Sequence, residues 1–132
     1  MANARRTFLI LSSMAAVSTQ LTARGQALEA KSTMYGLIGK MTAVPGQRDV
    51  LAAMLLESTQ AMPGCLSYVI ASDPADADAL WITEVWDDAA SHEASLQLPQ
   101  VQAVIRKARP LIAGFSNRVE TVPLGGHGLK PA

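Results

Sequence analysis

The sequence contains a single cysteine, Cys65. One cysteine cannot form an intramolecular disulfide, and it excludes zinc or iron–sulfur sites that need several cysteine ligands. The chain also lacks an excess of either charge, because 11 lysines and arginines balance 11 aspartates and glutamates. It therefore has no overall basic field of the kind that draws proteins to nucleic acids or anionic membranes.

A long apolar run is also missing from the N-terminal region. The run from Phe8 to Val17 has about ten residues, roughly half of what a membrane-spanning helix requires, so no stable membrane anchor is expected. Two arginines precede this run, and Gly25 and Ala27 follow it at spacings that suit a cleavage site. This order of basic, apolar and small-residue regions is typical of an export signal.

The segment Arg5-Arg6-Thr7-Phe8-Leu9 resembles the twin-arginine export motif. The sequence thus predicts a signal peptide over residues 1–30 and a bacterial protein that is periplasmic or secreted after the peptide is removed. Cutting after Ala30 removes three arginines and one glutamate, which leaves 8 basic and 10 acidic residues and a net charge of −2. The alternative is an ordinary amphipathic N-terminal helix or an uncleaved leader.

The remaining length is enough for one domain. Hydrophobic residues make up 49% of the chain and charged residues 17%, a balance that argues against disorder of the whole chain. The prediction is a single domain over residues 31–123, followed by a flexible, glycine-rich tail over residues 124–132 that has no core-forming pattern.

The spacing of apolar residues and the Pro-Gly turns predicts strands and helices in a β-α-β-β-α-β order. The expected strands are 35–44, 65–71, 80–86 and 115–122; the expected helices are 47–62 and, in two pieces, 87–96 and 99–110. This order is typical of an α+β, ferredoxin-like fold, in which a four-stranded antiparallel sheet carries its helices on one face.

The second face of such a sheet needs a cover. The strand 80–86 carries apolar side chains on both faces, with Trp81 and Val85 on one and Leu80, Ile82 and Trp86 on the other. An uncovered apolar face favours a partner, and a homodimer in which two sheets pack together is the simplest solution. A domain of about ninety residues also has a small core, which gains from a partner.

Four stretches resemble a known family: Val44–Gln47, Met62–Tyr68, Trp81–Asp88 and His92–Leu96. Together they resemble the antibiotic biosynthesis monooxygenase (ABM) domain, or quinol-monooxygenase-like group, over about residues 34–122. The resemblance implies a dimeric α/β-barrel with a ligand cavity between sheet and helices in each protomer. Family members include cofactor-independent monooxygenases acting on quinols or polyphenolic polyketides, haem-degrading enzymes, and proteins with no assigned activity.

His92 is the first candidate catalytic residue, because the other histidine, His127, lies in the glycine-rich tail. It follows Asp88 by one helical turn, so that carboxylate could orient the imidazole ring. The predicted role, supported mainly by the matching family position, is to accept a proton from a hydroxyl of a quinol-like substrate. The alternative is a partly exposed helix histidine with an acidic neighbour.

Glu84 and Trp86, the other predicted catalytic residues, share one face of a strand with apolar neighbours. Trp86 could form the flat wall of an aromatic-ligand pocket or belong to the core. A glutamate on an apolar face is costly unless it is paired. It could bind a substrate hydroxyl or pair with Arg106 or Arg109 across the gap between sheet and helices, and the pairing is favoured.

Tyr68 and Asn117 join Trp86 in the predicted substrate-binding set. The Tyr68 hydroxyl could face the pocket, and Asn117 could polarise a carbonyl or bind oxygen species, while a structural role is the alternative for each. Cys65 is expected to pack as a small hydrophobe. The aspartates of residues 73–78 lack the glycine and terminal glutamate of a calcium loop, so a solvated turn and no metal site are predicted.

The predicted function is oxidation of a quinol or polyphenolic aromatic by molecular oxygen, without a bound cofactor. Haem degradation is disfavoured, because the haem-degrading relatives use a first-strand asparagine and a later-helix histidine, and residues 34–44 and 99–112 contain neither. A non-enzymatic dimer that binds quinones or other aromatics in the cell envelope is the second possibility. A purely structural dimer, with no pocket beside Trp86 and His92, is the third.

Overall fold

The computed structural model describes Arg24 and residues 32–129. The predicted export segment lies outside the described residues except for Arg24, as do the last three residues of the predicted tail. The elements are β1 (Tyr35–Ala43), α2 (Arg48–Ser58), β2 (Cys65–Ser72), β3 (Ala79–Trp86), α3 (Ala89–Ser95), α4 (Pro99–Ala108), the 3-10 turn η1 (Arg109–Leu111) and β4 (Ile112–Thr121).

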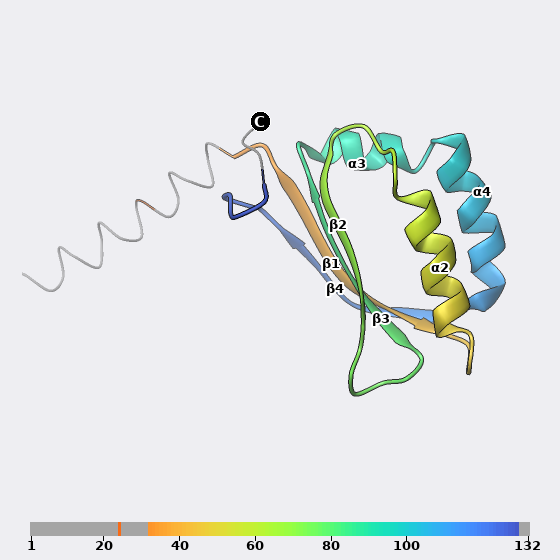
Figure 1. Cartoon of the computed structure of the whole chain (residues 1–132). Helices are drawn as coiled ribbons and strands as arrows, with labels where there is room; N and C mark the ends of the chain where they lie inside the picture. Colours follow the sequence, from red (N-terminus) through yellow and green to blue (C-terminus); the bar gives the residue numbers. More distant parts are fainter. Residues whose placement is uncertain (1–23, 25–31, 130–132) are drawn as a thin grey trace, which may run out of the picture. The chain divides into compact units, whose positions relative to one another are not determined.

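The four strands form one antiparallel sheet in the order β2-β3-β1-β4. Helices α2, α3 and α4 all lie on one side of it (Figure 1). Strand β1 is central, because it pairs with β3 on one edge and with β4 on the other. The predicted α+β, ferredoxin-like fold with helices on one face of the sheet is therefore confirmed.

The first helix ends four residues earlier than predicted, at Ser58. The Ser58 hydroxyl donates to the Leu55 carbonyl at 2.9 Å, and the Gln60 amide donates to the Leu56 carbonyl at 3.0 Å. These side chains satisfy carbonyl groups that a further helical turn would otherwise have bonded. Local side-chain hydrogen bonding therefore ends the helix before the Pro-Gly turn that follows it.

The last strand begins three residues earlier than predicted, at Ile112. Gly114 was expected to precede it but lies inside the strand and pairs with Thr42 of β1, because an extended backbone accommodates glycine. Pro110 acts as predicted, since α4 ends at Ala108 and the proline lies in η1. Proline has no N–H with which to continue the helix.

The core lies between the sheet and helices α2 and α4. Leu51 of α2 is fully buried, and the cluster around it includes Met41 of β1, Leu80 and Ile82 of β3 and Ala108 of α4. Burial along β3 alternates as the sequence predicted, with Leu80, Ile82, Glu84 and Trp86 all buried. The helix-side face of β3 therefore carries Glu84 and Trp86, two of the three predicted catalytic residues.

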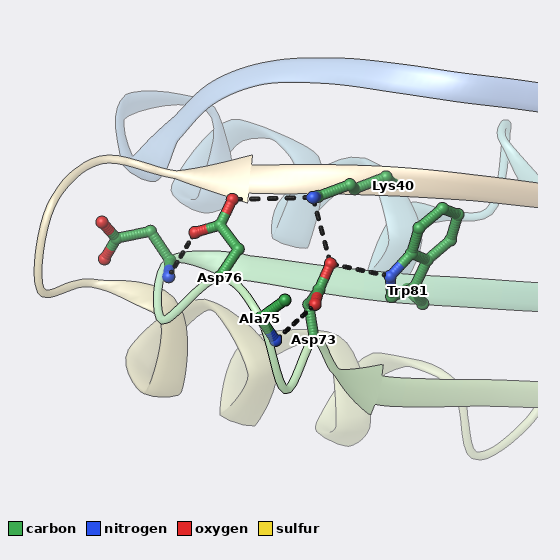
Figure 2. Close-up of polar contacts among 6 residues, drawn as sticks. Lys40, Asp73, Ala75, Asp76 and Trp81 are labelled. Atoms are coloured by element: carbon green, nitrogen blue, oxygen red, sulfur yellow. Dashed lines mark hydrogen bonds and ion pairs between the residues drawn. The ribbon is translucent and has the colours of Figure 1, made fainter.

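A polar network ties the β2–β3 turn to the central strand (Figure 2). The Asp73 carboxylate lies 3.0 Å from Lys40 Nζ of β1 and accepts hydrogen bonds from Trp81 Nε1 at 3.0 Å and the Ala75 N–H at 2.8 Å. Asp76 lies 3.6 Å from the same ammonium group. The prediction of a solvated turn is wrong for Asp73, whose side chain is only 10% exposed, because the turn folds back over Lys40.

Replacing Asp73 should reveal how this network responds to acid. The Ala75 N–H, followed by Lys40 and Trp81, holds the pKa of the Asp73 carboxyl below its ordinary value. A carboxyl with a lowered folded-state pKa contributes stability above its unfolded-state pKa, and that contribution is lost as the pH falls through the folded-state pKa. Asp73→Asn should therefore be less stable than wild type at pH 7, with the difference shrinking as the pH falls below 3.8, the ordinary pKa of an aspartate.

Urea unfolding at a series of pH values measures this difference. Asp49→Asn is the matched control, because the Asp49 side chain is 86% exposed, and it should show little change at any pH. A difference between Asp73→Asn and wild type that stayed constant from neutral to acid pH would contradict the assigned role of the carboxylate charge.

Candidate functional site

A cavity of about 580 Å³ lies between the helix-side face of the sheet and helices α2, α3 and α4. Most of its lining side chains are apolar, among them Met41, Leu55, Met62, Val101, Ile105 and Phe115. Its volume and apolar lining are typical of sites for small organic ligands. Trp86 and His92 both line it, which contradicts the third possibility, a purely structural dimer with no pocket beside them.

A second cavity of about 500 Å³ adjoins the first. Tyr68, Glu84 and His92 line both cavities, and so does Phe115 of β4, whose side chain is 71% exposed. The three polar residues therefore sit where the two spaces meet, and an exposed aromatic ring lies at the same junction. The sequence marked Phe115 only as a strand residue, because its place beside the cavity depends on the pairing of β4 with β1.

Glu84 and Trp86 are joined by a hydrogen bond on the helix-side face of β3. They are two residues apart on one strand, so their side chains point to the same face. The indole Nε1 of Trp86 donates to Glu84 Oε2 at 2.9 Å. Trp86 is only 1% exposed and also lines the cavity, so it is at once a core residue and a pocket wall.

The Glu84 carboxyl is buried beside the cavity, with only 9% of the residue exposed. Burial raises the pKa of Glu84, because an apolar environment disfavours the charged form. The Trp86 hydrogen bond, followed by the electrostatic influence of His92 and Arg118, acts in the opposite direction on the pKa of Glu84 without cancelling the effect of burial. Glu84 thus holds its proton more tightly than a solvated glutamate does.

The predicted pairing of Glu84 with an arginine of the last helix is wrong. Within residues 32–129, the Glu84 carboxylate forms no ion pair with Arg106 or Arg109, and both arginines are exposed. The indole of Trp86 on the same strand instead holds the carboxylate against the sheet. Because both guanidinium groups are in water, they keep the hydration that burial beside Glu84 would remove.

His92 reaches the same group of side chains from α3. Its Nε2 lies 3.7 Å from Glu84 Oε2, and its side chain is 13% exposed. The predicted partner, Asp88, has a different role: its carboxylate accepts the Ser91 N–H at 2.7 Å and caps α3. A free N–H of the first helical turn is the closer partner for a capping carboxylate, so the ring contacts the sheet carboxylate instead.

Two aromatic rings flank the His92 imidazole. The ring centroid of Tyr35 lies 5.1 Å from that of His92, and the centroid of Trp86 lies 5.5 Å away in an edge-on arrangement. Tyr35 was missed by the sequence analysis. Its position follows from the register of β1 and β3, in which Tyr35 pairs directly with Trp86. The two rings restrict the orientations open to the imidazole.

Tyr68 lies directly opposite Glu84 in the β2–β3 register. Burial, and then the neighbouring charge of Glu84, raise the pKa of the Tyr68 hydroxyl. The hydroxyl therefore stays protonated and can donate a hydrogen bond. The predicted placement of Tyr68 at the pocket agrees with its position in the lining of both cavities.

Asn117 is not brought to this group of residues. It is exposed and does not line either cavity. It lies where the β1–β4 pairing shifts register between Ile38 and Lys40, and its φ of +52° is in the left-handed region. Asparagine tolerates that conformation better than most residues, so its place in the strand has a backbone explanation.

Two absences apply to the described part of the chain. Residues 32–129 contain no group of three or more histidine, cysteine, aspartate or glutamate side chains placed to hold a metal ion. No helix among them is long and apolar enough to cross a membrane.

The Cys65 thiol is half-buried and lies 3.6 Å from the Ser67 carbonyl, and burial raises its pKa.

The family model described as antibiotic biosynthesis monooxygenase (ABM) matches residues 34–107, more than half of the chain. The chain belongs to the ABM family. The match spans β1 to α4 and so includes every residue of the polar group at the cavity junction. Strand β4, which supplies part of the cavity wall, comes after the matched residues in the sequence of this ABM domain.

Solved structures agree with the assignment. A Chloroflexus aurantiacus protein provisionally named an antibiotic biosynthesis monooxygenase is 64% identical, with a TM-score of 0.72, and the match covers 74% of this chain and 99% of that one. PA3566 of Pseudomonas aeruginosa is 26% identical, with a TM-score of 0.63, and the match covers 71% and 97%. No curated protein sequence matches the chain.

A third structure, of a SnoaB mutant, shares the ABM fold. SnoaB, a cofactor-independent oxygenase from Streptomyces nogalater, is 12% identical, with a TM-score of 0.58, and the match covers 73% of this chain and 98% of that one. At this identity the likeness establishes the fold alone, so the chemistry of the present ABM chain has to be argued from its own residues.

Proposed function

We propose that this ABM chain is a monooxygenase that oxidises a quinol or polyphenolic aromatic with molecular oxygen and without a bound cofactor. The observation that carries the proposal is the 3.7 Å approach of His92 Nε2 to the buried Glu84 carboxylate at the junction of two apolar cavities. The His92 imidazole is thus a proton acceptor beside a cavity whose size and apolar lining suit an aromatic ligand.

In the proposed reaction, His92 takes the proton of a phenolic hydroxyl. The imidazolium that forms is stabilised by the Glu84 carboxylate beside it. The resulting phenolate is rich in electrons and is the species that reacts with oxygen. One oxygen atom enters the substrate, and substrate electrons and protons reduce the other to water.

The walls of the cavity support this chemistry. The buried indole of Trp86 offers a flat surface for stacking an aromatic ring. The surrounding apolar side chains exclude water from the phenolate and from the oxygenated intermediate, which limits side reactions. Tyr35 and Trp86 hold the His92 ring between them, so the proton acceptor is oriented before the substrate binds.

His92→Ala should reduce oxygen uptake with a hydroquinone by about 10²–10⁴-fold, the usual contribution of a general base. Oxygen consumption by the purified protein is measured with a range of hydroquinones and polyphenols as substrates. His127→Ala is the matched control, because His127 is exposed and distant in sequence from the site, and it should retain the wild-type rate.

Equal rates for His92→Ala and wild type would remove His92 from the mechanism. Wild-type protein that binds hydroquinones but consumes no oxygen would overturn the oxygenase proposal and favour the non-enzymatic binding function instead. The apolar lining and the few convergent polar groups would suit that function equally well.

We also propose that the chain is a homodimer that packs through the sheet face opposite the helices. Val69 of β2 and Val119 of β4 lie on that face by the strand registers, and each is 52% exposed. Apolar side chains spread across an open sheet face favour a partner surface, and the open sheet fits a dimeric barrel.

Light scattering after size exclusion tests this arrangement. Wild type should have the mass of a dimer, and the double variant Val69→Lys with Val119→Lys should have the mass of a monomer, because two buried charges per protomer oppose association. Leu56→Lys is the matched control, since Leu56 is 51% exposed on α2 at the helix side, and it should stay dimeric. A monomeric wild type would contradict the proposal.

A further inference from the structure

Strand β4 contains one extra residue relative to β1 at the position of Asn117. The residue before it, Ser116, pairs with Lys40 of β1. Beyond it, Val119 pairs with Ile38, so two steps along β1 correspond to three steps along β4. This is the pattern of a β-bulge, and Asn117 takes the positive φ of +52° at this point.

The bulge determines which face of the sheet carries the Arg118 side chain. If the register before the bulge continued unchanged, Arg118 would pair with Ile38. Ile38 follows Leu37, which lines the second cavity, so the Ile38 side chain points to the opposite face of the sheet. The extra residue instead places Arg118 among the residues that line this cavity. Bulges often re-aim a side chain beside a functional site.

Lys40 and Arg118 are both cationic residues of the second cavity lining, and only one of them is open to a ligand. The Lys40 ammonium group is held by Asp73 and Asp76 (Figure 2). Within residues 32–129, the Arg118 guanidinium pairs only with Glu120, at 3.0 Å from Nη1, and both side chains are more than half exposed. Such an exposed ion pair is weak. The forked N–H donors of Arg118 therefore remain open to an anion, and their geometry matches a carboxylate.

A glycine of the central strand leaves open space in the same cavity. Gly39 lines the second cavity, and a Cβ atom added to it would meet no atom within 4 Å beyond its chain neighbours. Its φ lies outside the left-handed region, so the backbone does not require glycine here. A glycine inside a strand forgoes side-chain packing and often marks the close approach of a ligand. The space above Gly39 suits a flat ring.

We propose that the second cavity binds a phenolic substrate that carries a carboxylate, with Arg118 binding the carboxylate and the aromatic ring lying over Gly39. The cavity has about 500 Å³, enough for one ring with a short acid side chain. His92 lines the same cavity and is the proton acceptor for the phenolic hydroxyl. This substrate class deepens the proposed oxygenase function and rests on it for the reaction.

The charges of the cavity lining orient such a ligand. The Glu84 carboxylate repels the carboxylate of the ligand, whereas the Arg118 guanidinium attracts it. The acid group is therefore directed to β4, and the hydroxyl is left beside the His92 imidazole, which faces Glu84. An uncharged quinol has no group that uses Arg118 and should bind more weakly.

Anaerobic titration calorimetry with two probes tests the carboxylate site. The probes are 2,5-dihydroxyphenylacetate and its methyl ester, which share the hydroquinone ring and differ in charge. The full chain should bind the acid about tenfold more tightly than the ester at pH 7. Arg118→Gln should weaken binding of the acid by about tenfold, the loss of one charge-assisted hydrogen bond, and leave binding of the ester unchanged.

Two further variants make the outcome specific. Arg109→Gln is the matched control, because Arg109 is exposed and lines the first cavity but not the second, and it should bind the acid as wild type does. Gly39→Val fills the space assigned to the ring and should weaken binding of the acid and the ester alike. Equal wild-type affinities for acid and ester, an equal loss for both in Arg118→Gln, or wild-type affinities in Gly39→Val would overturn the proposal.

Anaerobic binding is separable from the proposed oxygenation, because it needs no turnover. Binding of the acid through Arg118 without any oxygen uptake would support the carboxylate site and overturn the oxygenase function. Oxygen uptake with hydroquinones, together with wild-type affinity of Arg118→Gln for the acid, would overturn the carboxylate site and leave the oxygenase function standing.

Discussion

The hydrogen bond from Trp86 Nε1 to Glu84 Oε2, at 2.9 Å, is the interaction on which the site depends. A carboxylate on the core face of a sheet would otherwise lack a donor and would cost several kcal/mol. Because the donor belongs to a buried indole on the same strand, it is fixed by the packing of the core itself. Glu84 can therefore remain in an apolar cavity, where its basicity differs from that of a surface glutamate.

Most of this site could be predicted from the sequence, because strand alternation determines which side chains share a face. The pattern of residues 80–86 placed Glu84 and Trp86 together, and the family resemblance added His92 and Tyr68. The hydrogen-bond and ion-pair partners of these polar side chains could not be predicted in the same way. Whether Glu84 meets an arginine or an indole, and whether Asp88 meets His92 or a backbone N–H, depends on competing contacts only a few ångströms apart.

The missed and misplaced residues share a physical cause. Tyr35 lies at the site because β1 pairs with β3, and Asn117 lies away from it at a shift in the pairing of β1 with β4. These strands are distant in sequence, so no local pattern determines their register. A shift of a single residue turns a side chain to the other face of the sheet, which makes such positions the least predictable.

The fold alone does not decide the reaction, because structures with 12% to 64% identity share it. The chemistry open to this chain depends on a small set of polar groups in an apolar space, in which the His92 imidazole lies 3.7 Å from Glu84 Oε2. This pair suits the activation of a phenol. It depends on a carboxylate that Trp86 holds in place and that burial makes more basic.

The most direct test of this account is a carbon-13 NMR titration of the Glu84 carboxyl in wild type and in Trp86→Phe. Burial should place the wild-type pKa above the ordinary glutamate value of 4.5. Because the indole hydrogen bond lowers the pKa, its removal should raise the pKa of Glu84 further. A wild-type pKa at or below 4.5, or one that does not change in Trp86→Phe, would contradict the account.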